Sequence, residues 1–323
     1  MHNPLAIILG PTASGKTAVS VRVAQLLDGE IISGDSMQVY RRLDIGTAKI
    51  QPAEMAGIPH HLIDILDPDD SYSVADFRLA AQNLITEITA RGKLPIIVGG
   101  TGLYISSLTT SYLFPPASGQ NSQFRAQLRQ RLELEGSAVI HAELAACDPE
   151  AALRIHQNDH HRLIRALEVY QQSGRPISDF QRLSREEPAP AYNLALVGLT
   201  WQRELLYSRI EARVEAMINA GLVDEVQALL GAGVAPDAQS MQGLGYKQIA
   251  AFLQAKCSLE EATELLKRDT RRFAKRQYTW FKRDARIKWY DAENYLTSDH
   301  YPQTEKLAQE MAIYIQREIR RRP

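Results

Sequence analysis

The sequence predicts an α/β fold, with a parallel β-sheet core flanked by helices and an all-helical insertion domain. Three observations predict it. Short apolar runs rich in β-branched residues alternate with stretches of helical period over the first hundred residues. The first apolar run leads into a glycine-bracketed loop that ends in Lys-Thr. From residue 115 to residue 192 the alternation stops, and only helical periodicity remains.

Five apolar runs, bounded by Gly, Pro or Asp, are expected to form the strands: 5–10, 29–34, 60–66, 93–100 and 193–200. The runs 5–10 and 93–100 are apolar almost throughout, which is typical of strands buried on both faces. The first four runs are separated by stretches of helical period, notably 16–27 and 74–92. Crossover helices of this kind join parallel strands.

The helical insertion domain is expected at 115–192, after a stretch rich in Pro, Gly, Ser and Asn. One helix should begin at a cap formed by Asn121 or Ser122, and another should end at Gly174. Residues 1–114 with 193–323 are expected to form the catalytic core, helical from Trp201 onward and carrying basic C-terminal helices.

Length and composition narrow the class of protein. A chain of 323 residues is long enough to bury a full hydrophobic core without help from disulfides or bound metals. Its two cysteines, Cys147 and Cys257, match neither a disulfide framework nor a metal site. With no signal sequence and no apolar run of membrane-spanning length, we expect a cytoplasmic protein. The net charge is only −1, but ten Lys or Arg face two Asp between residues 267 and 288. Local charge is therefore the better guide to a partner.

The loop after the first strand fits the P-loop spacing G-x-x-x-x-G-K-[ST]. Its glycines turn backbone amides toward an anion, its lysine reaches the outer phosphate and its threonine offers a hydroxyl to Mg²⁺. The loop consists of Gly10, Pro11, Thr12, Ala13, Ser14, Gly15, Lys16 and Thr17. No strand ends in a Walker-B acid and no Asn-Lys-x-Asp follows, so nothing in the sequence positions a hydrolytic water.

Asp35 and Thr101 follow the second and fourth runs, at the sheet edge where a ligand crevice forms. Asp35 could be a Mg²⁺ ligand, a general base or a helix N-cap, and local chemistry supports the three roles equally. Ser36 and Gln38 could bind a base edge or simply form the turn. Thr101, among glycines that let a ligand approach, could act in the reaction or cap the next helix.

Arg209 and Arg213 lie one turn apart on a predicted helix, and neither has an acid three or four positions away. They are either solvated or directed at an external anion, for which a diphosphate is the obvious candidate. The buried stripe of this helix is expected to be Leu206, Ile210, Val214 and Met217.

The stretch 267–290 interleaves cations with aromatic residues. Phe273, Trp280 and Phe281 share a stripe that should pack inward, and the cationic face favours a nucleic-acid backbone over solvent alone. Residues 159–165 add further cations, with two adjacent histidines that indicate a metal only weakly.

Seven stretches, in order from residue 10 to about residue 289, resemble the tRNA dimethylallyltransferases, also called tRNA isopentenylpyrophosphate transferases. They are GPTASGKT, DSMQVYRRLDIGTAK, HHLID, GKLPIIVGGTGLY, DPEAALRIHQNDHHRLIRALEVY, SMQGLGYKQ and TRRFAKRQYTWFKRD. The resemblance covers nearly the whole chain, and seven ordered motifs make it specific. No Cys/His zinc module follows Trp289, as in the compact bacterial form.

The resemblance implies transfer of a dimethylallyl group from dimethylallyl diphosphate to N6 of the adenosine 3′-adjacent to the tRNA anticodon. The P-loop would then hold the diphosphate rather than ATP, with Mg²⁺ near Thr17. Asp35 would be the general base, with Thr101 beside it. Lys16 and Arg213, the latter alone or with Arg209, would bind the diphosphate.

The same resemblance implies contacts with tRNA from several segments, and Arg125 is its loosest match. These residues are Asp35, Ser36, Met37, Gln38, Thr101, Arg125, His161, Arg162, Leu163, Ile164, Arg165, Gln242, Gly243, Leu244, Gly245, Tyr246, Lys247, Lys275, Arg276, Gln277, Tyr278, Thr279, Trp280, Phe281 and Lys282.

Three other functions share parts of this pattern. A nucleotide or small-molecule kinase has the same loop and sheet but needs no basic helix of this density. A prenyltransferase acting on free AMP or ADP needs none either. A non-catalytic RNA-binding protein would not need Lys16, Thr17 and Asp35 together. We expect a monomer, since one tRNA arm can be held between the core and the insertion.

Overall fold

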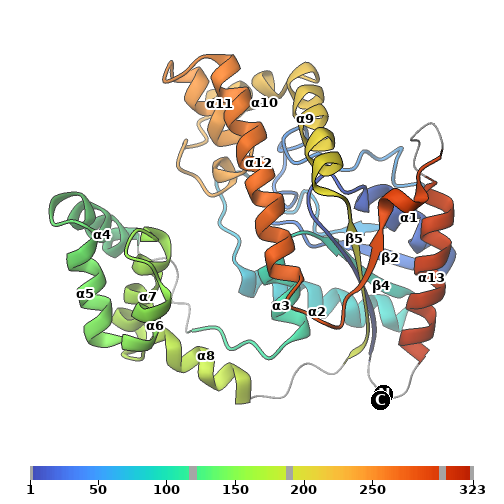
Figure 1. Cartoon of the computed structure of the whole chain (residues 1–323), viewed down its shortest axis with the longest axis horizontal. Helices are drawn as coiled ribbons and strands as arrows, with labels where there is room; N and C mark the ends of the chain where they lie inside the picture. The colour runs from blue at the N-terminus through green and yellow to red at the C-terminus, as the bar shows by residue number, and fades with distance from the viewer. Residues whose placement is uncertain (1–2, 116–121, 187–191, 298–302, 321–323) are drawn as a thin grey trace. The chain divides into compact units, whose positions relative to one another are not determined.

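The computed structural model describes residues 3–115, 122–186, 192–297 and 303–320 (Figure 1). Its sheet has six parallel strands in the order β3-β2-β4-β1-β5-β6. The strands are β1 (Asn3–Leu9), β2 (Gly29–Ser33), β3 (His60–His61), β4 (Leu94–Gly99), β5 (Tyr192–Thr200) and β6 (Lys288–Asp291). Helices flank this sheet, so the predicted fold class is confirmed.

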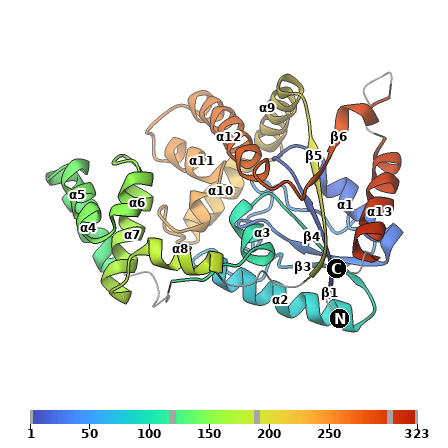
Figure 2. The ribbon, with the colours of Figure 1, turned by 60° about the horizontal axis from the view of Figure 1, so that its bottom comes forward.

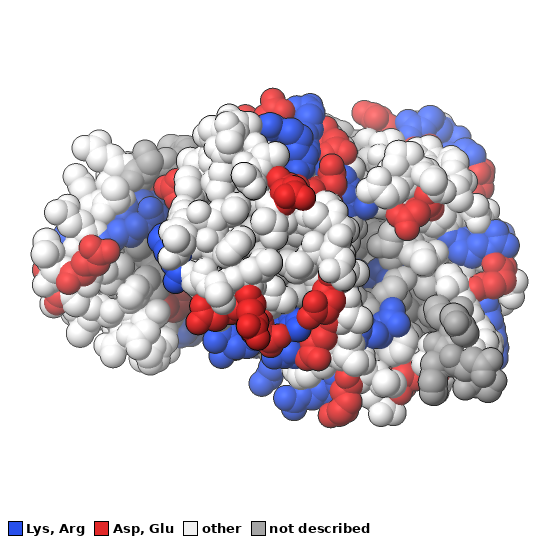
Figure 3. Space-filling view, turned by 90° about the horizontal axis from the view of Figure 1, so that it is seen from above, with Lys and Arg blue, Asp and Glu red and all other residues white. Residues whose placement is uncertain are grey.

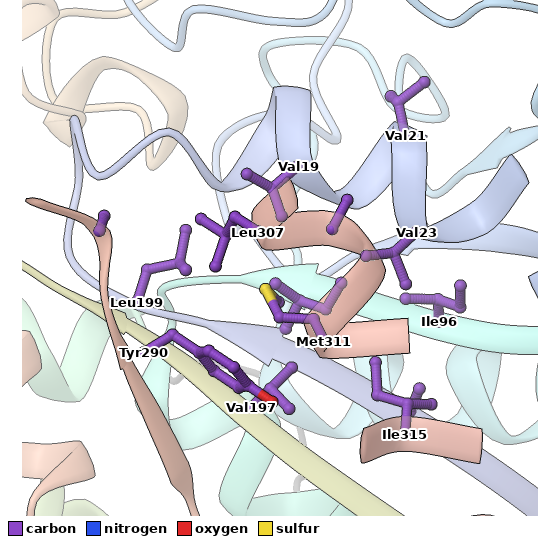
Figure 4. Close-up of a cluster of buried hydrophobic side chains, with 14 of the residues drawn as sticks. Val19, Val21, Val23, Ile96, Val197, Leu199, Tyr290, Leu307, Met311 and Ile315 are labelled. Atoms are coloured by element: carbon purple, nitrogen blue, oxygen red, sulfur yellow. The ribbon is translucent and has the colours of Figure 1, made fainter. Parts of the chain in front are cut away.

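Two helices cover one face of the sheet, α1 (Lys16–Leu27) and α13 (Thr304–Arg320). Side chains alternate along each strand, so every second residue of β1, β4 and β5 meets these helices in one apolar cluster. Figure 4 shows members of that cluster from both helices and from the sheet, among them Val19, Val23, Ile96, Val197, Leu307 and Met311. The helix α2 (Val74–Ala90), with a Ser73–Asp76 capping box, packs on the opposite face (Figure 2).

Two of the sequence-based strand assignments need correction. The run 60–66 forms a strand of only two residues, because Leu62 and Asp64 adopt positive φ angles of 62° and 54°. The buried Lys49 ammonium bonds to Asp64 and thereby holds the turn. The chain is also not helical throughout after Trp201, because residues 288–291 add β6 beside β5.

The chain divides into two compact units, and the first comprises residues 1–105 with 191–323. Its remaining helices lie between β5 and β6 in sequence, except for one 3₁₀ turn that follows β6. They are α9 (Arg203–Asn219), α10 (Leu222–Gly231), the 3₁₀ turn η1 (Ser240–Gln242), α11 (Tyr246–Leu253), α12 (Leu259–Phe281) and the 3₁₀ turn η2 (Ala292–Tyr295). Both α9 and α11 pack against α12. The boundary to the second unit falls within α3 (Gly102–Thr109).

The second unit comprises residues 106–190, whereas the sequence predicted an insertion at 115–192. Its described part is helical: α4 (Ser122–Leu134), α5 (Ser137–Cys147), α6 (Pro149–Arg154), α7 (His160–Ser173) and α8 (Ile177–Glu186). The helix α7 begins at an Asp159 cap, and it ends at the predicted residue Gly174, which has a φ of 66°. Asn121, one of the two expected caps, lies outside the described residues, and α4 begins at Ser122 itself.

A small apolar core, to which α4, α5, α6 and α7 contribute, stabilises this unit. Inside it, the fully buried Glu168 carboxylate accepts hydrogen bonds from Arg125 and Arg165, each at 2.7 Å. Burial alone would raise the pKa of Glu168, but the two guanidinium groups together hold it below its ordinary value.

Across the described ranges, no helix has the length and apolar character needed to span a bilayer. On the face shown in Figure 3, Lys and Arg lie beside Asp and Glu, which agrees with a net charge near zero.

Candidate active site

A cavity of about 380 Å³ lies at the carboxyl ends of β1, β2 and β4. The P-loop follows β1, the Asp35 segment follows β2 and the Thr101 segment follows β4, so the three predicted segments meet there. The other walls come from α9, from residues 242–247 and from α12. This is the edge at which an open parallel sheet binds ligands.

The P-loop curves around its own lysine. Gly15 adopts a φ of 86° and Ala13 one of 62°, and the Lys16 ammonium donates to the Pro11 carbonyl at 2.6 Å. Burial, with a smaller contribution from the neighbouring Arg213, lowers the pKa of Lys16 to about 7, although Asp35 acts in the opposite direction. A cation held against another cation in a confined space is expected to bind an anion.

The two arginines of α9 differ in their surroundings. Arg213 lines the cavity, and it forms no ion pair with a carboxylate anywhere in the described ranges. Burial lowers its pKa, and Asp35 opposes that effect. Arg209 instead donates from Nε to the Ala13 carbonyl at 3.0 Å, and its guanidinium lies 4.4 Å from the ring centre of Trp201. It therefore supports the outside of the P-loop.

Asp35 is the only carboxylate among the described residues that line the cavity. Its Oδ1 accepts a hydrogen bond from the Met37 amide at 2.8 Å, which fixes the side chain in a turn. No helix begins directly after Asp35, so the N-cap role considered from sequence is wrong. The geometry leaves the roles of base and metal ligand.

Thr101 directly precedes α3, and its carbonyl accepts the amide of Tyr104 at 3.0 Å. Its side chain lines the cavity, and its hydroxyl makes no hydrogen bond within the described part of the chain. The hydroxyl therefore remains available to a ligand, while the backbone begins the helix.

The segments expected to contact tRNA divide into exposed and buried side chains. Lys275, Arg276, Thr279 and Lys282 are exposed, as are His161 and Arg162 in the second unit. Trp280, which was expected to pack inward, is 42% exposed, and Phe273 lines the cavity rather than the core. Met217, expected in the buried stripe of α9, also lines the cavity.

Several of the residues expected to contact tRNA have buried side chains. Leu163 and Ile164 belong to the core of the second unit, and Phe281, the last residue of α12, is buried. The buried Tyr246 donates its hydroxyl to Glu225 at 2.6 Å, and the buried Gln277 bonds to two loops. Leu163, Ile164 and Phe281 therefore offer no side chain to an RNA on the surface, whereas Tyr246 and Gln277 line the cavity. Arg125 and Arg165 are already paired with Glu168.

The cations on and just after α12 also fall into two groups. The earlier cations pair with acids: Lys267 with Glu215 and Glu264, Arg271 with Glu211, and Arg268 and Arg272 with Asp269. Lys275, Arg276, Lys282 and Arg283 form no ion pair within the described ranges. Arg276 and Lys282 instead lie 5.8 Å and 5.6 Å from the ring centres of Phe273 and Tyr278.

Sequence reasoning missed several residues that line the cavity. Gly46, Thr47 and Ala48 contribute from the far end of the motif that starts at Asp35, and the motif itself was the available signal. His60 also lines it, with Nδ1 2.8 Å from the Ile58 carbonyl, and burial lowers its pKa. Among the described residues, no cluster of three or more His, Cys, Asp or Glu could hold a metal.

Comparison with known proteins gives the same family repeatedly. A model described as IPP transferase matches residues 38–284. A tRNA dimethylallyltransferase of Carboxydothermus hydrogenoformans is 53% identical over 292 residues, covering 90% of this chain and 93% of its own. That of Pelotomaculum thermopropionicum is 51% identical over 309 residues, covering 96% and 95%.

Solved structures similar to this chain come from the same kind of enzyme. The full-length tRNA isopentenylpyrophosphate transferase of Bacillus halodurans has a TM-score of 0.69 and 43% identity, covering 98% of both chains. A eukaryotic dimethylallyltransferase acting on tRNA has a TM-score of 0.75 and 30% identity, covering 90% of this chain and 74% of its own.

Proposed function

The chain belongs to the IPP transferase family, and from that premise we propose the reaction of its cavity. The protein is a tRNA dimethylallyltransferase. It transfers a dimethylallyl group from dimethylallyl diphosphate to N6 of an adenosine in tRNA and releases diphosphate. The adenosine is the one 3′-adjacent to the anticodon.

One observation carries the proposal. The cavity brings Lys16 and Arg213, two of its cations without acid partners among the described residues, together with a single carboxylate, Asp35. An allylic carbon loses its diphosphate readily once the leaving charge is stabilised, so catalysis needs fixed positive charge and amides at the P-loop. It also needs one base. A P-loop nucleotidase or kinase would in addition hold Mg²⁺ with an acid at the end of a strand, and this Walker-B acid is missing.

The adenine must leave its stack to enter the cavity, as other base-modifying enzymes require. The N6 nitrogen forms a bond to C1 of the dimethylallyl group while the C1–O bond to diphosphate breaks. Asp35 accepts the proton that N6 loses, and Lys16 and Arg213 bind the departing diphosphate. The Thr101 hydroxyl is available to orient the amine. Atoms and charges balance without a further reactant.

Mg²⁺ is part of the proposal. Thr17 stands exposed at the start of α1 and lines the cavity, in which Asp35 is the only carboxylate among the described residues. Few protein ligands suit Mg²⁺ held chiefly by substrate phosphates and water. When bound, the ion would add positive charge at the leaving diphosphate.

The tRNA is proposed to lie against the unpaired cations Lys275, Arg276, Lys282 and Arg283. Such a contact would weaken as salt is added, because phosphate binding releases counterions. We propose that the enzyme acts as a monomer, and in the cytoplasm, where its tRNA substrate is found.

The test is one incubation of the protein with Mg²⁺, radiolabelled dimethylallyl diphosphate and unmodified tRNA, with and without ATP. Label should enter the tRNA without ATP, and a transcript with guanosine at the target position should remain unlabelled. If no label is transferred but ATP is consumed with a nucleotide or small alcohol, the protein is a kinase instead. Labelling of free AMP in preference to tRNA would indicate the other prenyltransferase.

A further inference from the structure

The side chain of Gln277 joins two neighbouring loops that line the cavity, the one that follows β1 and the one that follows the adjacent strand β4. It lies on α12 and is 6% exposed. Its Oε1 accepts the Thr12 amide at 2.9 Å, and its Nε2 donates to the Gly100 carbonyl at 2.9 Å. Thr12 belongs to the P-loop, and Gly100 directly precedes Thr101. One planar amide therefore bridges the site of the leaving group and the segment that carries Thr101.

The Gly99–Gly102 segment is shaped to receive this side chain. A Cβ at Gly100 would lie 2.1 Å from Gln277 Nε2, closer than any contact allows. A Cβ at Gly102 would lie 2.4 Å from the Trp280 ring, on the same helix. Glycine at both positions lets α12 approach the backbone of this loop.

The bridge also determines which P-loop amides can bind an anion. The Thr12 amide is used by Gln277, so the diphosphate must be held by later amides of the loop together with Lys16. A shift of Gln277 would move the P-loop relative to Thr101. Because the reacting atoms must approach within about 3.5 Å, a displacement of about 1 Å can reduce the rate about a hundredfold.

We propose that Gln277 is a positioning residue, whose amide holds the P-loop and the Thr101 segment at the separation that the transfer requires. The proposal rests on the proposed function for the reaction, but not for the binding of diphosphate. Gln277 was expected from sequence to contact tRNA, and its burial assigns it this other role.

The decisive variant is Gln277→Glu. One carboxylate oxygen can still accept from the Thr12 amide, but the other faces the Gly100 carbonyl and repels it. Protonation restores a donor, and a buried carboxyl has a raised pKa. We expect kcat at least about tenfold below wild type at pH 8. The ratio of variant to wild type should recover several-fold by pH 6, with KM for tRNA unchanged.

Gln248→Glu is the matched control. Gln248 is 5% exposed, and its amide likewise joins two groups, the Gly245 amide at 3.0 Å and the Asp269 carboxylate at 3.1 Å. The same substitution therefore costs stability there without touching the two loops. The new carboxyl faces the Asp269 carboxylate, so its pKa is raised and the melting temperature of this variant should vary with pH. The kcat ratio of the folded variant to wild type should not vary with pH. An equal pH dependence of the kcat ratio in both variants, or none in Gln277→Glu, overturns the proposal.

Two further measurements keep the proposal testable. The first uses a second variant in case Gln277→Glu does not fold, and the second measures binding in case the proposed function is wrong. Gln277→Asn keeps the amide but is one methylene shorter, so it reaches only one loop. It should lose kcat while its melting temperature changes little, and wild-type kcat in this variant would overturn the proposal. Because the wild type itself binds an anion more tightly at lower pH through Lys16, the quantity to compare is the ratio of variant to wild-type affinity for inorganic diphosphate. This ratio should fall in Gln277→Glu at pH 8 and recover at pH 6. That result needs no transfer of label to tRNA.

Discussion

The basic stretch on and just after α12 has two parts, which carry similar positive charge but differ in whether that charge is paired with acids. From Lys267 to Arg272 every cation is paired with an acid. From Lys275 to Arg283 none is paired within the described ranges. The first group joins α12 to α9 through Glu211 and Glu215, whereas the second leaves its charge for an external partner.

The same difference separates the two arginines of α9. Arg209 supports the P-loop from outside by binding the Ala13 carbonyl and stacking on Trp201, whereas Arg213 enters the cavity beside Lys16. Positive charge without an internal partner thus distinguishes groups that meet a ligand from groups that hold the fold. Four predictions test this distinction.

The largest effect on kcat is expected at Asp35, which forms no ion pair with the described cations of the cavity. Asp35→Ala should reduce kcat about 10²–10⁴-fold, because it removes the acceptor for the N6 proton. Affinities for tRNA and diphosphate should change little. Single-turnover kinetics and equilibrium binding measure the two effects separately, and unchanged turnover would remove Asp35 from the mechanism.

Arg213→Ala should reduce kcat/KM for dimethylallyl diphosphate about 10²–10³-fold, since it removes a donor to the leaving group. Arg209→Ala is the matched control from the same helix, and it should cost less because that side chain contacts only the loop backbone and Trp201. Steady-state kinetics at saturating tRNA compare the two. The distinction between paired and unpaired cations fails in α9 if Arg209→Ala is the more damaging.

On α12, replacing Lys275, Arg276 and Lys282 together by alanine should weaken tRNA binding about 10–100-fold. The slope of log K against log salt should fall by about 2–3, because each phosphate that is no longer neutralised keeps its counterion. Filter binding across a salt series measures both.

The control triple replaces Arg268, Arg271 and Arg272, whose charges are already balanced by acids. It should leave affinity and slope close to wild type. Equal losses in the two triples would mean that ion pairs within the chain do not determine where tRNA binds.

The smallest effect concerns pH. The pKa of Lys16 in the empty cavity is about 7, so above pH 7 the side chain is mostly neutral. A bound anion favours the charged form and raises this pKa, so binding near pH 8 should take up a proton and KM for the donor should rise with pH. Calorimetry of diphosphate binding in two buffers with different ionisation enthalpies measures this uptake. Lys16→Met should abolish it, and uptake that persists in the variant would belong to another group.

Much of the fold could be predicted because its signals are local. The apolar runs that became β1, β2, β4 and β5 are continuous, and each is bounded by residues that end strands. β3 was overestimated because positive φ angles at Leu62 and Asp64 depend on the buried Lys49, far from the run itself. β6 was missed because a four-residue strand has little pattern of its own and is stabilised by β5, some ninety residues earlier.

By itself, the sequence determined the P-loop, the presence of Asp35 and Thr101 at the carboxyl edge of the sheet, and the family to which the ordered motifs point. These depend on residue type and spacing within single segments. Only the tertiary structure decided which cations stay unpaired, that Gln277 bridges two loops, and that Leu163, Tyr246 and Phe281 are buried. The reason is physical: pairing and burial arise between segments as far apart as Thr12 and Gln277, separated by 265 positions, and no local pattern encodes that contact.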